Sequence, residues 1–268
     1  SLHSSISEAL ASGDLTTLGT IIGNNPEALA AAIAAPVGVE KIPVYPVANF
    51  GSQMAPLYTI LALWVGSILM VVSLRSDVTD ATVADGLPEG DPLRATLTAK
   101  PVGLAAGYLG RYLIFGTIAL TQATLLGLGD LYFLKVQHAH PLQFMGTLWL
   151  TAVVFSFLMY TLIATFGNAG KALGVLLLVL QISGAGGAFP LAILPSFFSS
   201  VSPFLPATHA ITALRASIAG YAGHEYGDAM WFLASFILFT AFLGLALRPL
   251  LVRNNRRMVE KLESTKLL

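Results

Sequence analysis

Long apolar runs separated by short polar stretches form the hydropathy pattern of this chain. Five of the runs come close to the roughly 20 apolar residues that an α-helix needs to cross the hydrocarbon core of a bilayer. They cover about residues 55–74, 112–134, 144–166, 172–188 and 229–247. The pattern therefore predicts an all-α, polytopic membrane protein with five transmembrane helices.

The stretch between the fourth and fifth runs, residues 184–220, is apolar but contains four prolines. A proline removes a backbone donor and clashes with the preceding turn, so this stretch cannot be one continuous helix. Lipid offers no hydrogen bonds to the freed backbone, which must therefore be covered by protein or meet water. Ile211, Leu214 and Ile218 recur at helical spacing after Pro206. We predict a broken helical hairpin, re-entrant or interfacial, that either closes one end of the bundle or contacts substrate directly.

Composition supports a membrane location. Charged residues make up 10% of the chain, against roughly 25% in soluble domains, and the mean hydropathy is +0.75. There is no cysteine, which excludes disulfides and thiolate metal sites. We expect membrane lipid as the surroundings and no nucleic-acid partner.

The basic residues predict the orientation of the spans in a cell membrane. If the loop over residues 75–111, Lys171 and the C-terminal tail share one side, only Lys41, Lys135 and Arg215 of the 14 basic residues fall on the other. Cytoplasmic segments carry the excess of Lys and Arg. The N-terminal region is therefore predicted to be extracellular, and the C-terminus cytoplasmic.

Apparent catalytic and ligand-binding motifs fail on their spacing. The segment TFGNAGKA, residues 165–172, lacks the leading glycine and the trailing Ser or Thr of a phosphate loop. His224 and Glu225 resemble the start of a zinc-protease helix, but position 228 is Asp rather than His. We expect no enzyme activity, no cofactor and no metal.

Polar residues within the spans need partners, because lipid provides none. Gln122 lies in the second span and Gln181 in the fourth. Each is predicted to form a hydrogen bond between packed helices, and the alternative is a place on a substrate path. Asp130 is expected near the outer end of the second span, within reach of water or Lys135.

Arg215 is the sole charged residue between Lys171 and Glu225. It falls at the edge of the apolar stripe, so its guanidinium must reach the outer surface or find acceptors. The carbonyls around Pro203 and Pro206 are close in sequence and lack regular helical partners. We predict that Arg215 locks the hairpin through them. The alternative is an ordinary exposed charge.

Two stretches resemble a known family. The sequence NFGSQMAPLYTILALWVGSILM, residues 49–70, resembles the entry to the membrane part of the YhgE/Pip, or phage infection protein, family. The sequence GAFPLAILPSFFSSVSPFLPATHAITALR, residues 187–215, resembles that family and also the wider class of type-2 ABC exporter permeases. The resemblance implies six spans, with the first preceding a large external domain and five following it. On that basis, this chain holds the end of the external domain and the last five spans.

The resemblance implies a division into three parts. Residues 1–48 are expected to be an extracellular stalk or the end of a larger external domain, residues 49–257 a permease-like membrane domain, and residues 258–268 a cytoplasmic tail. An exporter also needs a cytoplasmic element that receives an ATPase. The glycine-rich stretch before the second span, read as a short surface helix, is the candidate coupling segment, with Gly103, Gly107 and Arg111.

The function that the resemblance implies is a permease subunit that exports a lipid-like or cell-envelope substrate. It would work as a homodimer or a related heterodimer and be driven by a separate ABC ATPase. The alternative is a membrane scaffold or receptor without transport activity, which anchors an external domain for phage adsorption or as an accessory to secretion. A structural subunit of a secretion machine is the third hypothesis.

Overall fold

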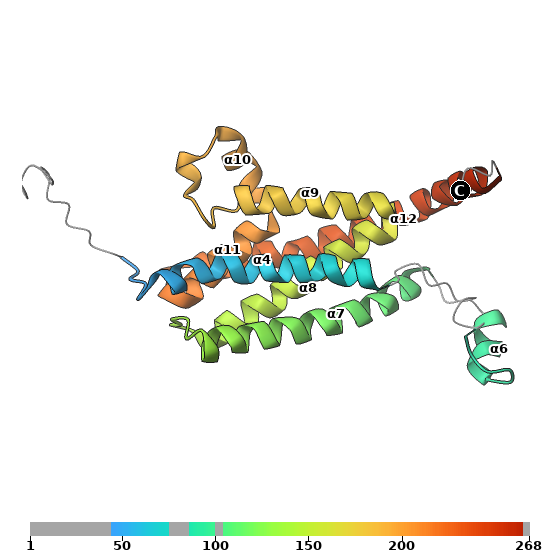
Figure 1. Ribbon diagram of the computed structural model, residues 1–268, viewed down its shortest axis with the longest axis horizontal. Coiled ribbons are helices and arrows are strands. Elements are labelled where there is room, and N and C mark those ends of the chain that lie inside the picture. The colour runs from blue at the N-terminus through green and yellow to red at the C-terminus, as the bar shows by residue number, and fades with distance from the viewer. Residues whose placement is uncertain (1–43, 75–85, 100–103, 265–268) are drawn as a thin grey trace, which may run out of the picture. The chain divides into compact units, whose positions relative to one another are not determined.

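The computed structural model describes residues 44–74, 86–99 and 104–264 (Figure 1). The described residues form helices joined by short connections, and no strand occurs among them. This confirms the predicted all-α class. The predicted stalk lies outside the described residues up to position 43, as does Gly103 of the coupling segment.

Four of the described helices are long and apolar enough to cross a membrane. They are α4 (Phe50–Ser73), α7 (Leu104–Leu128), which a π-helical turn η1 (Gly129–Phe133) extends, α8 (Pro141–Phe166) and the first part of α12 (Glu225–Ser264). The predicted fourth span corresponds to α9 (Asn168–Gly184), which has 17 residues and is shorter than these. The count of five spans therefore stays a prediction.

The second spanning helix begins earlier than the sequence suggested. α7 is continuous from Leu104, so the predicted surface helix before position 112 is wrong: these residues form the first turns of the span. Interior glycines weaken a helix by about 1 kcal/mol each but do not break it. Tyr108 is buried in this part of α7 and its hydroxyl contacts Thr161 of α8, which fixes the segment in the bundle.

Helix α8 is the centre of the bundle (Figure 1), and α4, α7, α9, α11 and α12 all pack against it. Of its most apolar window, 78% is buried, against 22% for α12. Phe155 of α8 packs edge-on against Trp64 of α4, with ring centroids 4.8 Å apart. Such aromatic pairs add to the stabilisation that comes from buried area alone.

Close packing of α8 and α9 depends on Gly170 and Gly174, and a third glycine forms the turn between the helices. Gly167, at φ +59°, turns the chain between the helices. A Cβ at Gly170 would lie 2.2 Å from the carbonyl oxygen of Leu162, and one at Gly174 would meet Met159. No side chain fits at Gly170 unless the backbones of α8 and α9 separate, so these small residues permit the close packing of the two helices.

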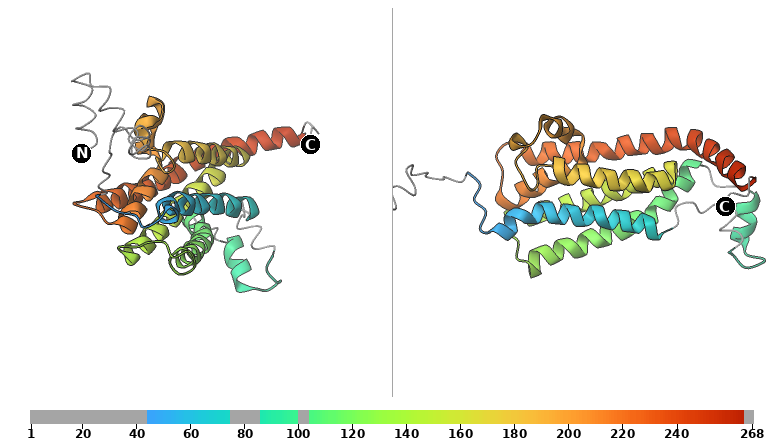
Figure 2. Two further views of the ribbon diagram at one scale, coloured as in Figure 1. Left: turned by 60° about the vertical axis from the view of Figure 1, so that its left-hand side comes forward. Right: turned by 45° about the horizontal axis from the view of Figure 1, so that its top comes forward.

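The proline-rich segment is broken, as predicted. It consists of η2 (Leu191–Ile193), α10 (Ser196–Val201), η3 (Ser202–Phe204) and α11 (Pro206–Ala219). Both views in Figure 2 show α10 folding back over the end of α9, which it contacts. The predicted apolar stripe of α11 is confirmed, because Ile211, Leu214 and Ile218 are each at most 1% exposed.

Candidate functional site

The connections at one end of the bundle form a network of polar contacts. At this end α4 begins, η1 leads into α8, α11 finishes and α12 begins; we call it the loop end. Gln137, in the connection between η1 and α8, joins that connection to the start of α4. Its side chain accepts a hydrogen bond from the backbone N–H of Ala48 at 2.6 Å and donates one to the carbonyl of Pro46 at 3.0 Å. Its backbone N–H donates to the hydroxyl of Ser52, so α4 and α8 are tied together here.

The same connection satisfies the end of α11. The backbone N–H groups of Ala139 and His140 donate to the carbonyl of Ser217 at 3.1 and 3.0 Å. The last carbonyls of a helix have no partner within it, so these bonds supply donors that α11 lacks. Gly220, at φ +90°, then turns the chain away from α11 toward α12.

Arg215 makes a hydrogen bond within the proline-rich region at this end. Its Nη2 donates to the carbonyl of Gly187 at 2.8 Å, which joins α11 to the connection between α9 and η2. The predicted acceptors near Pro203 and Pro206 are therefore wrong. The carbonyl of Pro203 is taken instead by Nε2 of His209 at 2.8 Å, because that histidine lies one turn inside α11 and points back over its start.

A cavity of about 360 Å³ opens beside Arg215, between the first turns of α4 and the last turns of α11. This volume is at the lower end of the range for small-molecule sites. Arg215 and Glu225 are the charged residues that line it, and both are exposed. The other lining residues are Tyr45, Val47, Ser52, Gln53, Pro56, Thr212, Ala216, Ile218, Ala219 and Gly220. The wall is therefore mostly apolar, with polar groups at separate points.

The sequence suggested that Asp130 reaches water or Lys135, and this prediction is wrong. Asp130 is 4% exposed, and its Oδ2 accepts a hydrogen bond of 2.7 Å from the hydroxyl of Thr59 in α4. The π-helical turn η1 widens the helix at this residue, and the carbonyl of Asp130 accepts from the backbone N–H of Val136. The turn thus rotates the carboxyl group inward, toward α4.

The two intramembrane glutamines each join two helices. Gln181 of α9 accepts a hydrogen bond of 3.0 Å from the backbone N–H of Ala207, in the first turn of α11. Gln122 of α7 donates to the carbonyl of Ala62 in α4 at 3.3 Å. Gly66 of α4 makes room for it, because a Cβ there would overlap the amide of Gln122.

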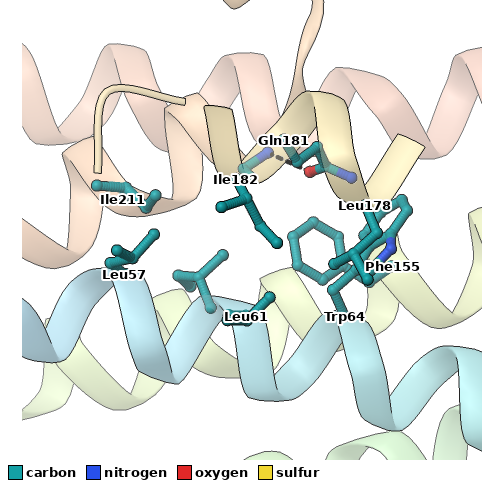
Figure 3. A pocket seen from close by; sticks show the side chains of 10 residues that line it. Leu57, Leu61, Trp64, Phe155, Leu178, Gln181, Ile182 and Ile211 are labelled. Atoms are coloured by element: carbon teal, nitrogen blue, oxygen red, sulfur yellow. Dashed lines mark hydrogen bonds between the residues drawn. The ribbon is translucent and has the colours of Figure 1, made fainter. Parts of the chain in front are cut away.

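A small apolar cavity lies beside Gln181, between α4, α9 and α11 (Figure 3). The figure shows Leu57 and Trp64 of α4 facing Leu178 and Ile182 of α9 across it. Its volume of about 20 Å³ holds one water at most. This cavity is therefore a packing gap, and the cavity at the loop end is the larger candidate site.

The described coupling residues lie at the opposite end of the bundle from the loop end. Gly107 and Arg111 occupy the first two turns of α7. In the loop that precedes α7, the structure has an eight-residue helix, α6 (Pro92–Ala99), which the sequence analysis missed. Asp91 caps it by accepting from the backbone N–H of Leu93 at 2.8 Å. The Asp-Pro pair at its start was the available signal, since Asp caps helices and proline suits their first position.

Comparison with known proteins gives a family and one relative. The family described as ABC-2 family transporter protein matches residues 2–246. A Bacillus subtilis (strain 168) protein of uncharacterised function, YhgE, is 25% identical over 214 residues, which is 80% of this chain. The matched region covers 25% of the length of that relative. No solved structure matches.

Proposed function

The chain belongs to the ABC-2 family of transporter proteins, and on that premise we propose that it exports a lipid-like or cell-envelope substrate with the help of a separate ATPase. It is a multi-pass membrane protein, and its family supplies the membrane-embedded component of transporters. The resemblance to YhgE noted in the sequence agrees with the similarity found over most of the chain.

The observation that carries the proposal is the cavity at the loop end. It is bounded by a spanning helix, α4, and by the broken segment, through α11, at the end of the bundle that the proposed orientation makes extracellular. Its mostly apolar wall suits a molecule with hydrocarbon chains, and its charged residues suit a polar headgroup. A hydrophilic solute would leave most of that wall without a complementary contact.

Coupling to an ATPase needs an element outside the bilayer that can transmit movement to the spans. We propose α6 for this role, together with the coupling segment predicted from the sequence, of which Gly107 and Arg111 lie at the start of α7. α6 is a short capped helix between two spanning helices, and α7 continues without a break from its first turn into the bundle. A displacement of this end of α7 would therefore move the whole helix.

For the proposed orientation, the loop end is extracellular and α6 is cytoplasmic. The chain has no cysteine, so single cysteines are specific probes. We propose Ala222→Cys at the loop end and Glu89→Cys before α6, both at exposed positions. An impermeant thiol reagent on intact cells should label position 222 and spare position 89. The reverse pattern would contradict the orientation.

We also propose that the transporter contains two copies of this chain or of a close relative. The apolar helices of the bundle keep large apolar side chains exposed, among them Leu113 and Ile114 of α7 and Val175 and Val179 of α9. Lipid and a second copy are both suitable cover for such surfaces. Mass photometry in lipid nanodiscs should give two copies per particle, and one copy under all conditions would contradict the dimer.

The decisive experiment for export is isolation of the full complex from membranes, followed by reconstitution. A nucleotide-binding subunit should copurify, and ATP should drive movement of a fluorescent phospholipid between the leaflets of proteoliposomes. Pro92→Gly with Leu93→Gly in α6 should uncouple ATP hydrolysis from lipid movement. If no ATPase copurifies and no lipid moves, the scaffold hypothesis replaces the export proposal.

A further inference from the structure

The cavity at the loop end presents opposite charges at two separate points. Arg215, in the last turns of α11, and Glu225, at the start of α12, both line it. The two side chains are not within ion-pair distance of each other, and neither has an ion-pair partner among the residues that the structure describes. Among the described residues, the cavity thus holds a cation and an anion without an ion-pair partner.

Arg215 retains donors for a ligand. A guanidinium has five N–H donors, and the hydrogen bond to Gly187 is the contact that the structure shows for this one. Arginine pairs with phosphate and carboxylate groups through two parallel hydrogen bonds. The fixed position of Arg215 on Gly187 therefore suits it to hold an anionic group inside the cavity.

We propose that this cavity binds the zwitterionic headgroup of an amine-bearing phospholipid. Arg215 receives the phosphate, and Glu225 accepts hydrogen bonds from the primary ammonium group. The apolar wall, with Val47, Pro56 and Ile218, covers the start of the hydrocarbon chains. The inference rests on the proposed export function, because it names the class of substrate. Binding of the lipid itself needs no ATPase.

The test is a titration of the purified chain in a neutral detergent with short-chain phospholipids of equal chain length. The apparent Kd for the phosphatidylethanolamine should be about tenfold lower than for the phosphatidylcholine, whose quaternary amine has no N–H donor, and than for the phosphatidylglycerol, which has no amine. A tenfold change corresponds to about 1.4 kcal/mol. Glycerophosphoethanolamine, which lacks the chains, should compete for the same site and so distinguish recognition of the headgroup from partition of the tails.

Variants separate the two contacts from general effects. Glu225→Gln, at an exposed position, should keep the fold and abolish the preference for ethanolamine over choline. Arg215→Gln should weaken all three lipids, and Arg215→Lys should recover part of the loss. The matched control is Asp228→Asn, which removes a negative charge from the same turn of α12 but does not line the cavity.

Two results would overturn the inference: equal affinity of the unaltered chain for the three headgroups, or an unchanged ethanolamine preference in Glu225→Gln. Both concern binding in isolation, so either leaves the export proposal standing. Conversely, selective binding without any copurifying ATPase would sustain the cavity assignment and remove the export function. The exposed Glu225 keeps the test informative even if Arg215→Gln fails to fold.

Discussion

Helix α8 and the broken segment from η2 to α11 are both apolar, yet they are stabilised in different ways. α8 is continuous over 26 residues, so most of its backbone groups pair within the helix and its side chains are free to fill the core. The broken segment divides a similar length of chain into four short helical pieces. Polar side chains of α9 and α11 supply hydrogen bonds to backbone groups at or near its breaks.

Those side chains are few and specific. Gln181 accepts from the first turn of α11, Arg215 donates to the chain before η2, and His209 donates to the carbonyl of Pro203. A buried backbone group without a partner costs about 1–3 kcal/mol. A continuous span therefore tolerates the loss of any one polar side chain, whereas the broken segment depends on each of its own. This difference suits α8 to the role of a fixed support for the helices that pack against it.

The largest effect is expected from Gly170→Ala, because this substitution disturbs the packing of α9 against α8. The new Cβ would lie 2.2 Å from the backbone of Leu162, so α8 and α9 must separate. Overpacking against backbone should destabilise the protein by about 3 kcal/mol or more. Unfolding in a sodium dodecyl sulfate titration measures the loss. Gly110→Ala in α7, where a Cβ meets nothing within 4 Å, is the control and should leave stability unchanged or slightly raised.

Gln181→Leu should come next, with a loss of about 2 kcal/mol. The substitution leaves the backbone N–H of Ala207 without its acceptor at the start of α11, in apolar surroundings. The melting temperature should fall, and protease sensitivity should rise in the segment between α9 and α11 before the rest of the chain. A uniform loss of protection over the whole bundle would contradict a local role for this glutamine.

Arg215→Ala should cost about 1 kcal/mol, because its side chain is exposed and it makes a single hydrogen bond to Gly187. Arg215→Lys should restore only part of the loss, since an ammonium lacks the planar fork of a guanidinium. Melting temperature and cleavage at the loop end are the two readouts. If neither changes in Arg215→Ala, the residue is an ordinary surface charge and the hairpin lock is wrong.

Gln122→Leu should have the smallest effect, about 0.6 kcal/mol. This glutamine donates to the carbonyl of Ala62, which lies inside the continuous helix α4 and is already part of its hydrogen-bond ladder. Comparison of its melting temperature with that of Gln181→Leu tests the difference between the two regions directly. Equal losses at the two glutamines would remove the distinction between continuous spans and the broken segment.

The class of the fold and the breaks in the proline-rich segment were predictable from the sequence alone. Hydropathy over some 20 residues and the chemistry of proline are local properties, so the spans and the breaks around Pro195, Pro203 and Pro206 follow from them. The stripe of Ile211, Leu214 and Ile218 was predictable for the same reason. Where no proline intervened, as before position 112, the boundary could not be predicted, because packing of Tyr108 decided it.

Which polar groups meet depends on tertiary packing and could not be predicted from the sequence. Thr59 and Asp130 are 71 positions apart in sequence, and Arg215 and Gly187 are 28 apart. The carboxyl group of Asp130, near the end of a span, is as compatible with water as with Thr59 until the π-helical turn is known. The guanidinium of Arg215 has several freed carbonyls near it in sequence, and the fold decides which carbonyl it reaches. The cavity at the loop end has the same origin. Its walls come from the start of one helix and the finish of another, and no pattern within either of them specifies that they face each other.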